Sequence, residues 1–101
     1  MTNHAELSRD LALALGWKWV EIHDCGIVMV SESDDPCEPC AAFDYRMPDV
    51  AMPLLKWLMV EHKYTVDYGV HFAVWRHGAL ACLADTLEEV IARAVISVHA
   101  K

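Results

Sequence analysis

Residues 64–84, YTVDYGVHFAVWRHGALACLA, decide the fold, because this stretch predicts three short β-strands joined by two tight turns. Its runs are rich in β-branched and aromatic side chains, and Gly69 and Gly78 interrupt them where a turn favours glycine. Two hairpins in series form an antiparallel meander. We therefore expect this stretch to form the centre of the fold, with the rest of the chain covering it.

The register of the first of these hairpins depends on the length of its loop. A two-residue loop would place Val66 on the same face as Trp75, whereas a three-residue loop would place it with Val74. The third strand, residues 79–84, is apolar on both faces in either case. A sheet of this kind favours helices on both of its sides.

The chain before the meander predicts a helix and then a hairpin. Asn3 begins a capping box, apolar residues follow it at helical spacing, and Gly16 is well placed to end the helix. We expect this helix over residues 4–15. Two β-prone runs, residues 17–22 and 27–30, then predict the two strands of an N-terminal hairpin.

Two prolines complicate the second helix. Pro48 suits a first helical turn, but Pro53 inside a helix removes a backbone hydrogen bond. We expect the helix to begin between Asp49 and Met52 and to end near His62, with an apolar surface along most of its length.

The last helix has the clearest pattern. Thr86 and Glu89 form a capping box, which predicts a helix over residues 87–99. Its apolar stripe consists of Leu87, Val90, Ile91, Ala94, Val95 and Val98. The expected fold is a single α+β domain over residues 1–101. Its antiparallel β-sheet, the central meander plus the N-terminal hairpin, is sandwiched by three helices in α-β-β-α-β-β-β-α order.

Composition and charge limit the partners that the chain can have. The 101 residues are 55% hydrophobic, and eight Lys and Arg stand against fifteen Asp and Glu, for a net charge of −7. Because nucleic-acid binding depends on contacts from basic residues to phosphates, we expect no nucleic-acid partner. A protein partner with a basic surface fits the charge better, and the sequence leaves a homo-oligomer open.

The sequence pattern predicts neither a signal peptide nor a membrane-spanning segment. No apolar run approaches the roughly 20 residues of a membrane span, and residues 1–10 lack the pattern of a signal peptide. We expect a cytoplasmic protein without a membrane partner. In that reducing compartment a stable disulfide framework is not expected.

The strongest site candidate is a group of four soft metal ligands within eighteen residues, namely His23, Cys25, Cys37 and Cys40. The first pair lies in the hairpin turn, and the second lies in an acidic loop over residues 31–42. A Cys-x-x-Cys knuckle lets two thiolates face one tetrahedral Zn²⁺, and the turn could present the other two ligands. Three interpretations remain open, which are a structural zinc site, loop thiols without metal, and a disulfide.

No catalytic signature is complete. The order His-x-Cys and then Pro-Cys-x-x-Cys is similar to the zinc deaminase signature, but Cys25 stands where the general acid/base glutamate is required. No serine lies in a Gly-x-Ser-x-Gly elbow, and the six histidines are scattered. For His71 we expect a polar pair with Asp67 across the hairpin end. An enzyme, or a cofactor other than the candidate zinc, is therefore not expected.

Four stretches together carry a family resemblance. They are LALALGWKW (11–19), DYRMPDVAMPLLKWLMVEHK (44–63), FAVW (72–75) and DTLEEVIARAVI (85–96). In this order the chain resembles the phage ABA sandwich domain family, which comprises small phage and prophage proteins. The resemblance implies an α/β/α layered sandwich and implies no activity, since the family has no established general function.

Two functions from different classes follow as hypotheses. The first is a small acidic phage-type protein that acts without catalysis, as a binding module for a basic surface on a host factor in the bacterial cytoplasm. The alternative is a small-molecule binder, or a metal-assisted enzyme, with a pocket between sheet and helices. An exposed apolar patch rimmed by acids would favour the first function, and a pocket that gathers His, Cys and carboxylates would favour the second.

Overall fold

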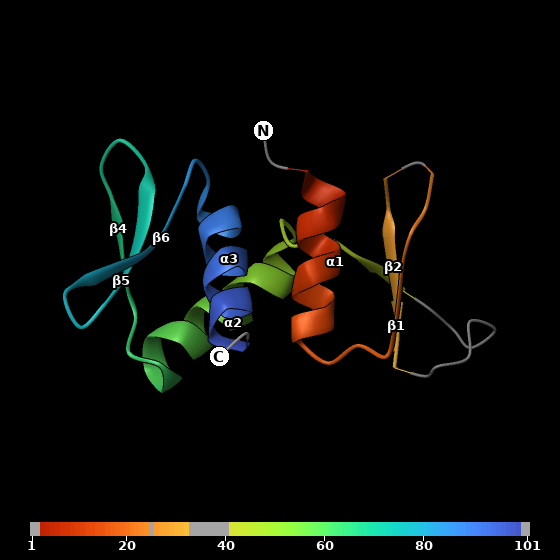
Figure 1. The fold of residues 1–101 in the computed structure, drawn as a ribbon, viewed down its shortest axis with the longest axis horizontal. Helices are drawn as coiled ribbons and strands as arrows, with labels where there is room; N and C mark the ends of the chain where they lie inside the picture. The colour runs from red at the N-terminus through yellow and green to blue at the C-terminus, as the bar shows by residue number, and fades with distance from the viewer. Residues whose placement is uncertain (1–2, 25, 33–40, 100–101) are drawn as a thin grey trace.

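A computed structural model describes residues 3–24, 26–32 and 41–99 of the chain. This described part has three helices and two three-stranded antiparallel sheets, which make an α+β fold (Figure 1). The helices are α1 (His4–Ala14), α2 (Pro48–Glu61) and α3 (Leu87–His99). The first sheet consists of β1 (Trp19–Ile22), β2 (Val28–Ser31) and β3 (Ala41–Phe43). The second sheet consists of β4 (Thr65–Tyr68), β5 (Phe72–Arg76) and β6 (Ala79–Ala84).

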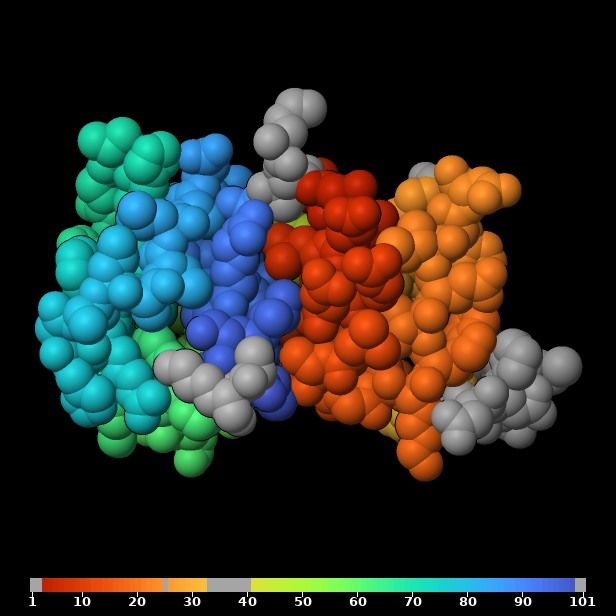
Figure 2. Space-filling view, viewed as in Figure 1, coloured from red at the N-terminus to blue at the C-terminus, as the bar shows by residue number. Residues whose placement is uncertain are grey.

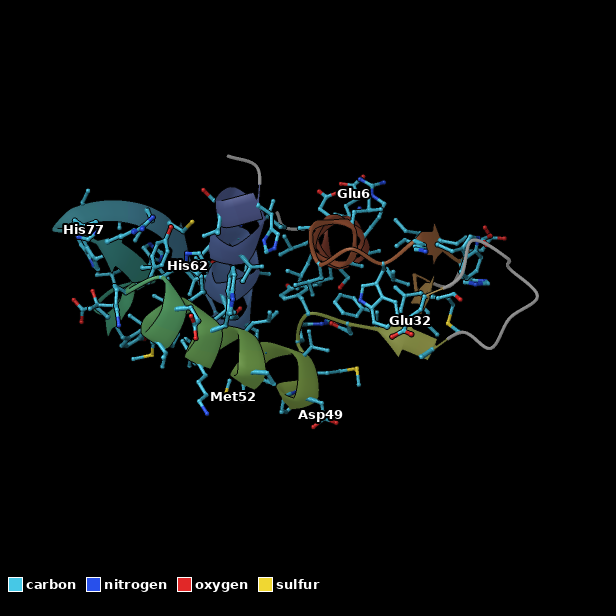
Figure 3. The ribbon with its side chains drawn as sticks, turned by 90° about the horizontal axis from the view of Figure 1, so that it is seen from below. Glu6, Glu32, Asp49, Met52, His62 and His77 are labelled. Atoms are coloured by element: carbon cyan, nitrogen blue, oxygen red, sulfur yellow. The ribbon has the colours of Figure 1, made fainter. Side chains whose placement is uncertain are left out.

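The helices fill the middle of the molecule, and the two sheets form its two ends (Figure 1). Helix α1 packs on β1 and β2, α3 packs on β5 and β6, and these two helices pack on each other. Helix α2 runs beneath them and packs against α3, as the view from below shows (Figure 3). The molecule is elongated, with extents of 45 × 28 × 22 Å.

The expected α+β class and the expected order of elements are confirmed, but the layering differs from the expected sandwich. We expected helices on both faces of a sheet, whereas each sheet has helices on one face only. Helix α3 explains the difference, because its buried residues include Ala92 as well as four of the six residues of the predicted stripe. A helix with so wide an apolar surface can pack on a sheet and on α1 at the same time.

The register of the second sheet follows the three-residue loop. Tyr68 pairs with Phe72, and Val66 pairs with Val74, so the loop holds residues 69–71. The inner face therefore carries Val66, Val74 and Cys82 toward the core. The opposite face carries Thr65, Asp67, Ala73, Trp75, Leu80 and Leu83.

The first sheet contains a strand that we did not predict. Residues 41–43 form β3, which pairs with β2 by placing Val28 opposite Phe43. Ala41 and Ala42, which we assigned to the acidic loop, therefore belong to the sheet. Three residues are too few for alternating hydrophobicity to reveal a strand, and this explains the miss.

The predicted helix ends are largely confirmed. The side chain of Asn3 accepts a hydrogen bond from the backbone N–H of Glu6 at 3.1 Å, and Gly16 follows α1 with a φ of +92°. Thr86 Oγ1 accepts in the same way from the N–H of Glu89 at 3.2 Å. Both helices thus begin with side-chain caps that satisfy first-turn donors.

The predicted start of α2 between Asp49 and Met52 is wrong. The helix begins at Pro48 and continues through Pro53 to Glu61. Pro48 occupies the first turn, where a missing N–H costs nothing, and the helix accepts the one lost bond at Pro53. The packing of α2 on α3 outweighs this loss.

The core runs through the helical middle of the molecule. Val90, Ile91, Ala94 and Val95 of α3 are each at most 1% exposed, which confirms the predicted stripe. Leu11 of α1 is equally buried. One cluster of buried residues includes side chains of both sheets and of these helices.

Candidate binding site

A pocket of about 340 Å³ lies between α1, the turn that joins β1 to β2, and the segment that links β3 to α2. Its apolar lining includes Ile27, Val28, Ala42, Phe43 and Met47. Its polar lining includes His4, Ser8, Asp44 and Arg46. A volume near 300 Å³ or above with a mostly apolar wall and a few polar groups is typical of small-molecule sites.

The polar side of the pocket is built on a tight turn at residues 44–47. The Asp44 carboxylate accepts a hydrogen bond from the backbone N–H of Arg46 at 2.9 Å, and the Asp44 carbonyl accepts from the N–H of Met47 at 3.0 Å. This is an aspartate turn, in which the side chain satisfies its own backbone two residues on. It directs the chain from β3 into α2.

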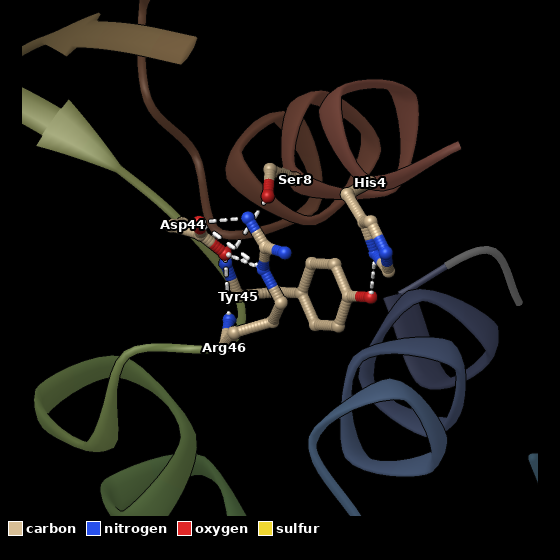
Figure 4. A network of polar contacts seen from close by, with 5 residues as sticks. All are labelled: His4, Ser8, Asp44, Tyr45 and Arg46. Atoms are coloured by element: carbon tan, nitrogen blue, oxygen red, sulfur yellow. Dashed lines mark hydrogen bonds and ion pairs between the residues drawn. The ribbon is translucent and has the colours of Figure 1, made fainter. Parts of the chain in front are cut away.

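Asp44 and Arg46 also form a two-point ion pair at the pocket wall (Figure 4). Arg46 Nε lies 3.0 Å from Asp44 Oδ1, and Arg46 Nη2 lies 2.7 Å from Asp44 Oδ2. The hydrogen bonds from Arg46 hold the pKa of Asp44 below its usual value, against the opposing effect of partial burial. In turn the carboxylate raises the pKa of Arg46, so both groups stay charged.

Tyr45, between these two residues, points into the protein. Its backbone N–H donates to Ser8 Oγ at 3.1 Å, and its hydroxyl is hydrogen-bonded to His4 Nδ1 (Figure 4). Burial raises the pKa of Tyr45, and the nearby charge of Glu89 adds to this effect. The buried tyrosine thus anchors the pocket wall to α1 at two points.

This arrangement offers groups that can bind a ligand. Ser8 is 2% exposed, and its oxygen already accepts a hydrogen bond, so it is a poor nucleophile. Nη1 of Arg46 makes no described hydrogen bond and can donate to a ligand. Because Asp44 offsets the charge of Arg46, the pocket suits a neutral or singly charged ligand better than a dianion.

The structure covers one of the four predicted zinc ligands. His23 lies at the turn between β1 and β2 with an exposed side chain, and its backbone N–H donates to the carbonyl of Ile27 at 2.8 Å. Cys25, Cys37 and Cys40 lie outside the described residues. Among the residues described, no three His, Cys, Asp or Glu side chains form a group that could hold a metal ion. The zinc site therefore stays a prediction.

His71 and Cys82 are two further residues with side chains that can react. His71 Nδ1 lies 2.9 Å from Asp85 Oδ1, so the expected pair with Asp67 is wrong. Asp67 points to the outer face of its strand, whereas Asp85 follows the strand end that lies beside His71. Cys82 faces the core, and burial raises the pKa of its thiol, which makes it a weak nucleophile.

Charge is divided unevenly between the two halves of the chain. Residues 1–50 contain ten acidic and three basic residues, which accounts for the whole net charge of −7, and residues 51–101 contain five of each. Within the described ranges the first half still has seven acids against three bases. The acidic half supplies α1 and the first sheet, at one end of the long axis, and the near-neutral half supplies α3 and the second sheet (Figures 1 and 3).

The outer face of the first sheet combines acidic and apolar groups. Pairing places Glu21, Met29 and Ala42 in one row on this face, with Trp19 beside Glu21. Trp19 and Met29 are half-buried, and Glu21 is exposed. Glu32 follows the end of β2 and is exposed.

Comparison with known proteins gave no relatives. No model of a known family matches the chain, and searches of curated proteins and of solved structures found no significant match. The resemblance to the phage ABA sandwich domain family therefore stays a prediction.

Sequence reasoning missed the pocket residues. His4 and Tyr45 are 41 residues apart, and nothing local links them. The run Asp44-Tyr45-Arg46 before Pro48 did carry a signal, because an aspartate ahead of a helix-starting proline is typical of a turn.

Every helix within the described ranges is too short or too polar to span a bilayer.

Proposed function

We propose that the chain is a non-catalytic binding module that engages a basic protein surface through the outer face of the first sheet. The observation that carries this proposal is the division of charge between the two halves of the described chain, which lie toward opposite ends of the long axis (Figure 2). The first half has seven described acids against three bases, and the second half is near neutral. A field concentrated at one end orients the molecule as it approaches a basic partner, which raises the association rate.

The same face offers apolar anchors within its acidic surroundings. Trp19 and Met29 lie beside Glu21 on the uncovered side of the sheet. Tryptophan is enriched among the residues that dominate binding energy, and a methionine side chain adapts to irregular surfaces. Acids around such anchors select basic partners and reject acidic ones.

The proposed biological setting rests on the family resemblance. A small phage or prophage protein in the bacterial cytoplasm would use such a face to occupy a basic surface on a host factor. The partner class, a basic protein surface, comes from the charge of the chain, and the phage setting comes from the resemblance alone.

The test measures binding of a fluorescein-labelled amphipathic peptide that carries Lys and Arg on one helical face and Leu on the other. We expect fluorescence anisotropy to show binding at low salt that weakens as NaCl rises. Glu21→Lys should weaken binding about fivefold, and Trp19→Ala about tenfold or more. Glu61→Lys is the matched control, because it makes the same charge change on α2 in the near-neutral half, and it should change binding by less than about twofold.

Equal weakening by Glu21→Lys and Glu61→Lys would contradict the proposal. It would mean that peptide binding depends on the net charge of the protein and not on where the charges lie. Full binding by Trp19→Ala would show that the first sheet is not the contact surface.

A second candidate function is small-molecule binding in the pocket between α1 and the first sheet. The specific observation is Nη1 of Arg46, which makes no hydrogen bond with the described residues, beside an apolar wall that includes Phe43. Benzoate and neutral benzamide are suitable probes in ¹H–¹⁵N NMR titrations. Both should shift the signals of residues 42–47, and Arg46→Gln should reduce the response to benzoate about tenfold, with less effect on benzamide. Shifts spread evenly over the protein would rule out this pocket.

A further inference from the structure

The outer face of the second sheet is an apolar surface without a covering layer. Pairing places Trp75 between Thr65 and Leu80, and Ala73 between Asp67 and Leu83, all on the side opposite α3. Leu80 is 45% exposed and Leu83 is 51% exposed, and both lie in β6, with Leu80 beside a bulge in its pairing with β5. In Figure 1 this sheet closes one end of the molecule, and no helix lies beyond it.

From this surface we infer that the protein forms a symmetric dimer, in which the outer faces of two second sheets pack against each other. The charge near this face favours a second copy of the chain as the partner that covers it. Residues 51–101 carry five acids and five bases, so two copies can meet at this end without net repulsion. Asp67 is the one charged side chain among the paired residues of this face.

The shape of the molecule supports the same geometry. The acidic first sheet lies at the other end of an axis that is 45 Å long, so end-to-end packing keeps the two acidic ends many Debye lengths apart. The Debye length is about 8 Å at physiological salt. Packing through the acidic end would instead bring both excesses of negative charge together.

The size of the face predicts a weak dimer. The two shorter extents, 28 and 22 Å, limit the contact to about 600 Å² per chain. Stable standard interfaces bury about 800 Å² per partner. We therefore expect a reversible dimer with a dissociation constant on the order of 10–100 μM.

Sedimentation equilibrium of the whole chain tests this dimer. The average mass should rise from 11.4 kDa toward twice that value with concentration, and added NaCl should leave the association unchanged or strengthen it. Leu83→Lys should raise the dissociation constant at least about tenfold, because it places an ammonium group in the apolar face. Leu80→Lys serves as a second variant, and circular dichroism checks that each variant is folded.

Val70→Lys is the matched control. Val70 is 88% exposed in the loop between β4 and β5, away from the paired rows of the face, and the same substitution there should change dimerisation by less than about twofold. A chain that stays monomeric near 1 mM would overturn the inference, as would equal effects of Leu83→Lys and Val70→Lys. Because binding to a basic partner should weaken with salt, the opposite salt responses keep this test separate from that of the proposed function.

Discussion

Asp44 organises the chain between β3 and α2 through its pair with Arg46. The pair holds the pKa of Asp44 below its ordinary value of 3.8. A carboxylate with a lowered pKa stabilises the fold while it is charged. This contribution is complete above about pH 4 and is lost as the pH falls through the lowered pKa.

The first prediction follows from the direction of this pH dependence. Asp44→Asn should destabilise the protein near pH 6, since the amide cannot form the ion pair. The difference in unfolding free energy between wild type and variant should shrink as the pH falls from about 6 to about 2. Urea unfolding at several pH values measures this difference. A difference that stays constant with pH would show that the charge of Asp44 contributes nothing to stability.

The second prediction concerns the four candidate ligands His23, Cys25, Cys37 and Cys40. If they bind zinc, metal analysis should find roughly one equivalent per chain, with Zn–S distances near 2.3 Å by X-ray absorption. A chelator should then lower the melting temperature while both helical capping boxes and the core persist. Cys37→Ser should abolish zinc binding, whereas Cys82→Ser, at a residue that faces the core of the other sheet, should not.

An unchanged melting curve after chelation, together with metal-free protein, would remove the zinc hypothesis. The thiols would then be free or paired, which a thiol titration under denaturing conditions would tell apart.

Single residues were predictable where their partners are near in sequence. Thr86 caps α3 as expected, because a capping box joins residues three positions apart. The bond between His4 and Tyr45 was not, because it depends on how α1 packs on the segment after β3. The pair of His71 with Asp85 was not predicted for the same reason, since it depends on how β5 lies beside β6.

At the scale of elements, α3 is the helix on which the other parts converge. It packs on α1, on α2 and on the second sheet. Ile91 is 1% exposed, so Ile91→Ala should reduce the unfolding free energy by about 2–5 kcal/mol. Val60→Ala on the exposed side of α2 is the control and should change it by less than about 0.5 kcal/mol. Similar losses for both variants would place Ile91 outside the core.

Helix α2 contains an interior proline, and we expect its replacement to stabilise the protein. Pro53 lies on the exposed side of the helix and cannot donate to the carbonyl of Asp49. Restoring the N–H with Pro53→Ala should raise the unfolding free energy by about 2 kcal/mol, after the gain in unfolded-state entropy is subtracted. Thermal and urea denaturation check this value. A loss of stability would mean that the helix needs the proline for its packing on α3.

Hydrophobic periodicity predicted the type of most elements, because long apolar stripes and alternating strands are local patterns. It did not predict which face of each sheet is covered. Leu80 and Leu83 indicated a second covering layer, and the protein leaves that side open. The choice depends on how α3 divides its apolar surface between α1 and the second sheet, which no local pattern contains.

At the scale of the whole molecule, the uneven charge has a cost in stability. Acids gathered at one end repel one another, and salt screens this repulsion. Raising NaCl from about 0.01 M to about 0.15 M should increase the melting temperature by about 2–5 °C. Glu21→Lys should reduce this increase, whereas Glu61→Lys in the near-neutral half should preserve more of it. A melting temperature that falls with NaCl would contradict a fold limited by its own repulsion.

The contact between α1 and α3 joins residues 4–14 to residues 87–99 and so closes the chain into a ring of packed elements. During synthesis, Leu7 and Leu11 leave the ribosome long before the helix that covers one side of α1 exists. The first sheet can form early, but the α1 surface meant for α3 stays open until nearly all of the second half has been made. Folding should therefore finish in one late step that depends on a distant contact, slower than in a helical bundle of equal length. In that interval the nascent chain offers an apolar helix to chaperones.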